Sequence, residues 1–266
     1  MINKTLFARE VRSSYKLLLI FLAVLTLYGS MIVAMFDPKL GDSLNLMAES
    51  MPEIFAAFGM LDVGATLTQF IVNYLYGFLL IAFPLVFIVL LSNRLVARYV
   101  DRGSMAYLLA TPNRRGRLAR TQALVLLLSS LCIVLWMTGL CWGVSAALFP
   151  GKLEVGAFLS VNAALYALLI FLSGLCFCAS CCCNDTRWSC GIGAGAGIAF
   201  LLIQMVSQVG EKFEGLKYIN PLTLFAPKAL LAGESWPVWG AAALAAAGLA
   251  LMGAGIGAFS RRDLPV

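Results

Sequence analysis

Six apolar stretches, each long enough to cross a bilayer as a helix, dominate this sequence. About 20 apolar residues in a helix span the hydrocarbon core of a membrane. The chain has 61% hydrophobic and only 12% charged residues, whereas roughly a quarter of the residues in soluble domains are charged. The sequence therefore predicts an all-α integral membrane protein with a single transmembrane domain over residues 1–266. The predicted spans are residues 17–36, 68–91, 121–148, 155–179, 191–209 and 238–259.

The basic residues are divided unevenly between the two sides that six spans create. Of the 19 Lys and Arg residues, 14 lie in the two terminal segments and in the loops 92–120 and 180–190. Of the 13 Asp and Glu residues, nine lie in the other loops. Loops rich in Lys and Arg stay in the cytoplasm, so both termini are predicted to be cytoplasmic. This distribution accounts for the net charge of +6 without nucleic acid as a partner.

The chain contains no histidine. Ser-His-Asp and Cys-His catalysis both need an imidazole base, and HExxH zinc sites need two histidines. The sequence also lacks the G-x-x-x-x-G-K-[ST] loop that holds nucleotide phosphates. We therefore expect no catalytic residue, no bound cofactor and no ATPase activity on this chain.

Several of the eight cysteines cluster between Cys176 and Cys190, in "CFCASCCCNDTRWSC". Thiolates suit copper(I) or zinc, but two C-x-x-C pairs at finger-like spacing are missing. We interpret the cluster as small residues that allow close helix packing, and we expect no metal site. Metal binding stays the alternative.

Two loop regions predict short helices outside the spans. Residues 4–16 predict an amphipathic elbow helix in the headgroup plane, with Phe7, Val11 and Tyr15 on its apolar face. It is either a basic anchor or an element that moves with the first span. Pro221 and Pro227 interrupt apolar turns in residues 210–237, which favours short re-entrant helices before the last span.

The loop "GSMAYLLATPNRRGRLAR", residues 103–120, lies between the second and third spans. Ser104 is a helix-capping residue, and Met105, Leu108 and Leu109 form an apolar edge at helical spacing. Pro112 ends the helix, because the residue before proline avoids helical geometry. An exposed apolar edge marks a contact surface. The sequence thus predicts a short cytoplasmic helix over residues 105–110 with basic residues after it.

The order "VDRGSMAYLLATPNRR" resembles the cytoplasmic loop of the permeases of type 2 ABC exporters. "SMPEIFAAFG", "LKYINPLTLF" and "FSRRDLPV" are similar to further stretches of that family, so the resemblance covers the chain in order. Asp101 stands where the family usually has Glu, and Arg120 and Gln122 stand where it often has Lys. The loop residues that match the family pattern or form its helix are Asp101, Gly103, Ser104, Met105, Leu108, Leu109, Thr111, Pro112 and Arg115.

The resemblance implies a function and partners. Two permeases, identical or homologous, form a pathway in the cytoplasmic membrane of a prokaryote. Two cytosolic ATPase subunits, which bind the ATP and Mg²⁺, each grip a coupling helix, here residues 105–110. The contact residues are then Asp101, Gly103, Ser104, Met105, Leu108, Leu109, Pro112 and Arg115. The expected cargo is an amphiphile: a peptide, a lipid or a drug.

Polar and small residues inside the spans add candidate sites. Gln69, Asn73, Tyr74 and Tyr76 lie near the outer end of the second span, before Pro84, which predicts a kink. Polar side chains in a span face protein or a cavity, so these four either line the mouth of a pathway or bond a neighbouring helix.

Gly191 and Gly195 in the fifth span have the spacing that lets helix backbones approach. They serve either internal packing, which the spacing alone slightly favours, or the contact between two permeases, which the resemblance supports for the fifth span.

Two other functions stay open. A scaffold that does not transport, and whose ATPase drives signalling or maturation, would keep the coupling loop but lack a polar lining. An ion-coupled carrier or channel usually needs charged groups within the membrane, and the span centres have none.

Overall fold

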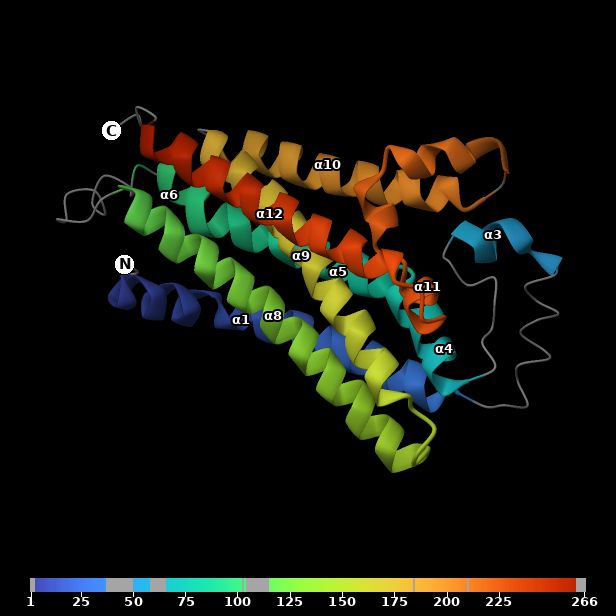
Figure 1. Ribbon diagram of the computed structural model, residues 1–266. Helices are drawn as coiled ribbons and strands as arrows, with labels where there is room; N and C mark the ends of the chain where they lie inside the picture. The colour runs from blue at the N-terminus through green and yellow to red at the C-terminus, as the bar shows by residue number, and fades with distance from the viewer. Residues whose placement is uncertain are drawn as a thin grey trace.

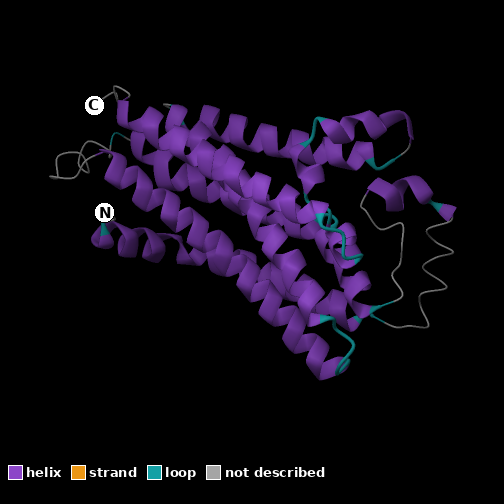
Figure 2. Cartoon of the chain, in the orientation of Figure 1, coloured by secondary structure: helices purple, strands orange, loops and turns teal. Residues whose placement is uncertain are grey.

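The computed structural model describes residues 3–36, 50–57, 66–101, 103, 115–183, 185–209 and 211–261. Within these ranges the chain is helical and contains no strand (Figure 2). Six helices are long and apolar enough to span a membrane, which confirms the predicted all-helical architecture. Five of them are continuous: α1 (Lys4–Ala34), α8 (Arg115–Leu148), α9 (Val155–Cys182), α10 (Thr186–Ser207) and α12 (Trp236–Arg261).

The second span, Leu67–Asp101, is built from five consecutive helical segments. They are α4 (Leu67–Ile71), the π-helix η1 (Val72–Tyr76), α5 (Leu79–Ser92), the π-helix η2 (Asn93–Ala97) and α6 (Arg98–Asp101). Pro84 lies inside α5, which runs without a break. The interruption lies earlier, at Gly77 and Phe78, where Phe78 has φ −139° and ψ −50°.

The predicted elbow helix and the first span form one helix, α1. No Gly or Pro occurs between Lys4 and Gly29 to break the backbone hydrogen bonds. Asn3 caps this helix, since its Oδ1 accepts from the backbone N–H of Leu6 at 3.2 Å. The face that α1 buries against the protein contains Glu10 and is polar in part, while the apolar residues predicted to face the headgroups point outward or are half-buried.

The helix α9 forms the centre of the bundle and packs against α12, α10, α8 and α5. Glycines permit its contact with α12: Gly174 lies against Gly248, and Gly255 lies against the backbone of Cys178. α1 runs beside α8 (Figure 1). There the indole N–H of Trp136 donates to Thr26 Oγ1 at 2.8 Å.

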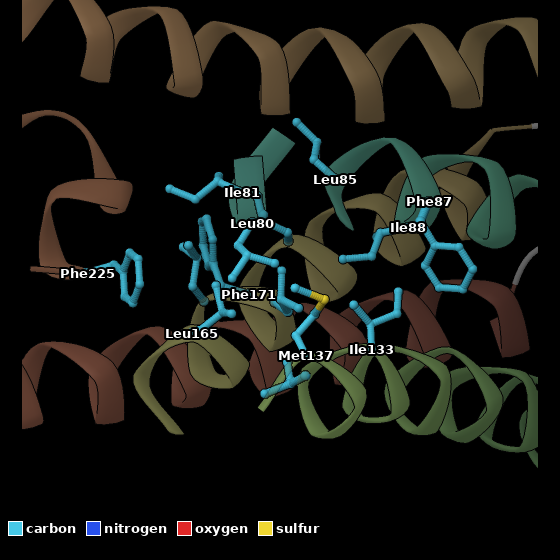
Figure 3. Close-up of a cluster of buried hydrophobic side chains, with 14 of the residues drawn as sticks. Leu80, Ile81, Leu85, Phe87, Ile88, Ile133, Met137, Leu165, Phe171 and Phe225 are labelled. Carbon is cyan, nitrogen blue, oxygen red and sulfur yellow. The ribbon is translucent and has the colours of Figure 1, made fainter. Parts of the chain in front are cut away.

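The hydrophobic core joins side chains from several spans and one connecting segment. Figure 3 shows Met137 of α8 and Leu165 of α9 in the same cluster as Leu80 of α5. Phe225 reaches this cluster from the segment that precedes α11. The connecting segment is therefore packed as part of the core.

Short helices precede the last span, as predicted. They are the 3₁₀-helices η3 (Glu211–Tyr218) and η4 (Pro221–Leu224), and α11 (Pro227–Leu231). Asn220 attaches them to α10, because its Nδ2 donates to the carbonyl of Phe200 at 2.9 Å while its Oδ1 caps η4. α11 packs against α9 and η1, at the end of the bundle opposite the two termini (Figure 1). Between the first and second spans, the described residues include the short helix α3 (Pro52–Ala57).

Candidate functional site: a cavity at the interruption of the second span

A cavity of about 360 Å³ lies where the second span is interrupted. Asn73 and Tyr76 of η1 line it together with Gly77. The other described lining residues are Val72, Gln204, Lys217, Phe225, Ala226, Pro227 and Lys228. The cavity is thus an open pocket bordered by the second span, α10 and the short helices before the last span.

The four predicted polar residues of the second span separate into two groups. Asn73 and Tyr76 both line the cavity and are buried. Gln69 instead forms a capping box with Thr66 at the start of α4, in which each side chain accepts from the backbone N–H of the other residue. Tyr74 packs its ring on Phe70, with the ring centroids 4.6 Å apart. Asn73 and Tyr76 therefore line the cavity, whereas Gln69 and Tyr74 form local contacts within the second span.

A buried hydrogen bond fixes Tyr76 in the cavity wall. Its hydroxyl donates to Oδ1 of Asn162 in α9 at 2.8 Å. The Asn162 Nδ2 in turn donates to the carbonyl of Phe158 at 2.8 Å. The Phe158 ring stands edge-on to the Tyr76 ring, at 84° and a centroid distance of 6.1 Å. Residues of α9 thus contact both the ring and the hydroxyl of Tyr76.

Gln204 of α10 brings an amide group to the other wall. Its Oε1 is buried and has no hydrogen-bond partner among the described residues. A buried polar atom without a partner costs stability, and native structures contain few of them. It is one of several such atoms among the described residues, and it is the one that belongs to a residue of the cavity lining.

Gln204, Lys217 and Lys228 were missed as site residues by sequence reasoning. They lie far from Asn73 in the chain, and the fold of the short helices brings them to the cavity. The only signal in the sequence is that each is a polar residue at the edge of an apolar segment. That pattern also occurs at ordinary helix ends, so it does not single them out.

The predicted coupling helix lies outside the described residues, as do Ser104, Met105, Leu108, Leu109 and Pro112. Its flanks are described. Asp101 ends α6 and accepts from Thr186 Oγ1 of α10 at 2.9 Å. Gly103 has φ +66°, a left-handed conformation that commonly follows a helix end. Arg115 begins α8.

The two candidate contact glycines of α10 face away from the rest of the described chain. A Cβ at Gly191 or Gly195 would meet nothing within 4 Å among the described residues. Gly193 and Gly197 form the opposite, buried face, and a Cβ at Gly197 would lie 3.0 Å from Leu85 Cδ2. Internal packing in α10 therefore uses the second pair and leaves the first pair exposed.

The cysteine cluster spans the end of α9 and the start of α10. Cys176 serves packing between these helices, since its Sγ lies 3.8 Å from the carbonyl oxygen of Gly193. In the part of the chain that the structure describes, no group of three or more Cys, His, Asp or Glu side chains is placed to hold a metal ion.

A second polar region, not anticipated from the sequence, joins helices near the termini. The Tyr99 hydroxyl donates to Glu10 Oε1 at 2.7 Å, and Arg94 donates to Ser13 Oγ at 3.1 Å. These bonds tie α1 to the end of the second span. Nearby, hydroxyl groups of Ser92, Ser180 and Ser189 form a buried chain that links the second, fourth and fifth spans.

Comparisons of the chain with protein-family models, with curated proteins and with solved structures find no match.

Proposed function

We propose that this chain is the membrane-spanning permease subunit of an ATP-driven exporter of the ABC type. Two copies, or this chain and a homologue, form the pathway, and separate cytosolic ATPase subunits bind and hydrolyse the ATP. The cargo is an amphiphile. The sequence resemblance of the loop after Asp101 supports the ATPase partnership.

The observation that carries the proposal is the cavity at the interruption of the second span, whose largely apolar wall includes polar side chains. The second span connects this cavity directly to the predicted coupling loop, because η1 lies at one end of it and α6 at the other. The termini and the start of α8 lie at the loop's end of the bundle (Figure 1). We expect movement of the loop to reach the cavity through the second span.

The π-helical segments suit such transmission. π-helical turns occur frequently at functional sites, and here one lines the cavity while the other precedes α6. The polar lining also favours export over a scaffold that does not transport, because a scaffold needs no site for cargo.

The test is copurification from native membranes in a mild detergent. We expect a soluble ATPase of roughly 200 to 300 residues to copurify in stoichiometric amounts. Leu108→Asp places a charge on the apolar edge of the predicted coupling helix and should abolish this association. Ile219→Asp is the control, since Ile219 is 71% exposed and follows η3 at the other end of the bundle. Absence of an ATPase, or its retention by Leu108→Asp, would contradict the proposal.

A further inference from the structure

Two cysteine side chains meet near the last turn of α9. Cys178 and Cys182 are four residues apart in this continuous helix, so they lie on one face of it. Their thiols are close enough to interact directly, and neither is part of a disulfide. Cys182 is exposed and Cys178 is half-buried, with Gly255 of α12 packed on the Cys178 backbone. The pair is thus an accessible dithiol whose first member is held in the bundle.

Helix geometry opposes a disulfide between these two thiols. Cβ atoms four residues apart in a helix are separated by about 5–6 Å, whereas a disulfide needs a Cβ separation of about 3.5–4.5 Å. A metal–thiolate bond is about 2.3 Å long, so a linear sulfur–metal–sulfur bridge spans about 4.6 Å between its sulfur atoms. Such a bridge joins the two thiols without unwinding α9, so the pair is suited to a metal ion.

The number of ligands and their surroundings select the metal. Thiolates are soft ligands that suit copper(I) and zinc. Structural zinc sites almost always have four ligands, and no group of three or more Cys, His, Asp or Glu side chains is placed to hold a metal in the described part of the chain. Copper(I) is stable with two sulfur ligands in line. The carboxyl end of a helix also carries partial negative charge, and α9 has no basic residue in its last turn to neutralise it.

We propose that Cys178 and Cys182 bind one copper(I) ion as a two-coordinate thiolate site. Two S–H bonds break, two S–Cu bonds form, and both protons pass to the solvent. Copper stays in its +1 state, so binding needs no oxidant or reductant. α9 ends shortly before α10 begins, at the end of the bundle that holds both termini (Figure 1). This end is predicted to be cytoplasmic, where thiols stay reduced. The site is independent of the proposed function.

The test measures copper(I) binding to the full chain, purified without oxygen in a neutral maltoside detergent with a reductant that contains no thiol. Copper(I) is supplied as its complex with bicinchoninate, whose colour fades as the protein takes up the metal. Native mass spectrometry counts the bound ions, and X-ray absorption counts the sulfur neighbours of the copper. We expect one tightly bound copper(I) ion per chain, with two sulfur neighbours.

Variants locate the site. Cys178→Ser and Cys182→Ser should each weaken copper(I) binding by about 100-fold or more, because loss of a mere hydrogen-bond partner of a metal ligand already costs about 10–100-fold. Cys132→Ser in α8 and Cys190→Ser in α10 are the matched controls and should leave the affinity unchanged. Thermal unfolding without copper checks that each variant folds. Copper(I) should also protect Cys182 of the parent protein from maleimide, a measurement that needs no variant.

Four results would overturn the inference: unchanged affinity in Cys178→Ser or Cys182→Ser, unprotected Cys182 in the parent protein, three or four sulfur neighbours around the copper, or zinc that binds as tightly as copper(I). The last two would assign the metal to a larger group of cysteines. Since neither an ATPase nor transport is involved, failure of this experiment is distinct from failure of the copurification above.

Discussion

The backbones of Gly174 in α9 and Gly248 in α12 lie in direct contact, and this contact sets the distance between the two helices. A Cβ at Gly248 would lie 2.6 Å from the Cα of Phe171, and a Cβ at Gly174 would overlap the carbonyl of Gly248. Small residues at helix crossings let backbones approach closely in membranes. α9 contributes much of the buried core. The two glycines determine how closely α12 packs against it.

Gly248→Ala should therefore destabilise the protein by about 1–3 kcal/mol, the usual cost of overpacking. The neighbouring atoms are backbone, which cannot rotate away. Thermal unfolding in detergent measures the change. Gly253→Ala in the same helix is the control, because a Cβ there meets nothing described within 4 Å. Equal unfolding temperatures for the two variants would show that the helices are not in contact at Gly248.

Tyr76→Phe should lower stability by about 1–3 kcal/mol, since it leaves the buried Oδ1 of Asn162 without its donor. The ring contact with Phe158 persists, so the loss reports the hydrogen bond alone. The measurement is again thermal unfolding in detergent. Tyr218→Phe serves as the control, because Tyr218 is 92% exposed. A Tyr76→Phe protein as stable as the parent would argue that this wall is not held by the bond.

The bond between Glu10 and Tyr99 predicts energetic coupling between α1 and the end of the second span. Hydrogen bonds to charged groups contribute about 1.5–3 kcal/mol, and Glu10 is only 1% exposed. A double-mutant cycle with Glu10→Ala and Tyr99→Phe should show a coupling energy in that range. The exposed Arg12 of the same helix, replaced by Ala, should show little coupling to Tyr99→Phe. Additive effects of Glu10→Ala and Tyr99→Phe would refute the link.

The exposed glycine face of α10 predicts a contact between two copies of this chain. Gly195→Leu should leave the protomer folded, because its surroundings are open, and should weaken self-association measured by crosslinking in membranes. Gly197→Leu should instead impair folding, since Leu85 occupies that space. Gly253→Leu, at another open glycine, should leave both folding and association unchanged. Undiminished crosslinking of Gly195→Leu would place the contact on another face.

The spans could be predicted because a helix of about 20 apolar residues matches the thickness of the hydrocarbon core of a membrane. Their ends could not, because a helix continues past the apolar stretch wherever no residue breaks it. α8 accordingly begins at Arg115, before the predicted start at residue 121, and α1 includes the predicted elbow helix. The two π-helical segments have no comparable signature in the sequence.

The cavity was predictable only in part. Asn73 and Tyr76 are polar residues three positions apart, on one face of a helix. Their presence in an apolar span identified them as candidate site residues. Gln69 and Tyr74 are also polar residues of this span, but they form a helix cap and an aromatic contact instead. Lys217 and Lys228 reach the cavity through the arrangement of short helices, which depends on tertiary contacts such as that of Asn220 with Phe200.

The π-helical segments also bear on how this chain tolerates changes in length. A π-helical turn holds one residue more than the α-helical turn it replaces. Deleting one residue from η2 would leave a stretch still long enough to cross a bilayer, and the topology would persist. It would also keep the two halves of the second span in their present rotational register, because the shortened turn becomes an ordinary α-helical turn. The same deletion within α5 would instead rotate one half of the second span against the other by about 100°. Membrane insertion would persist, but Asn73 and Tyr76 would turn away from the cavity.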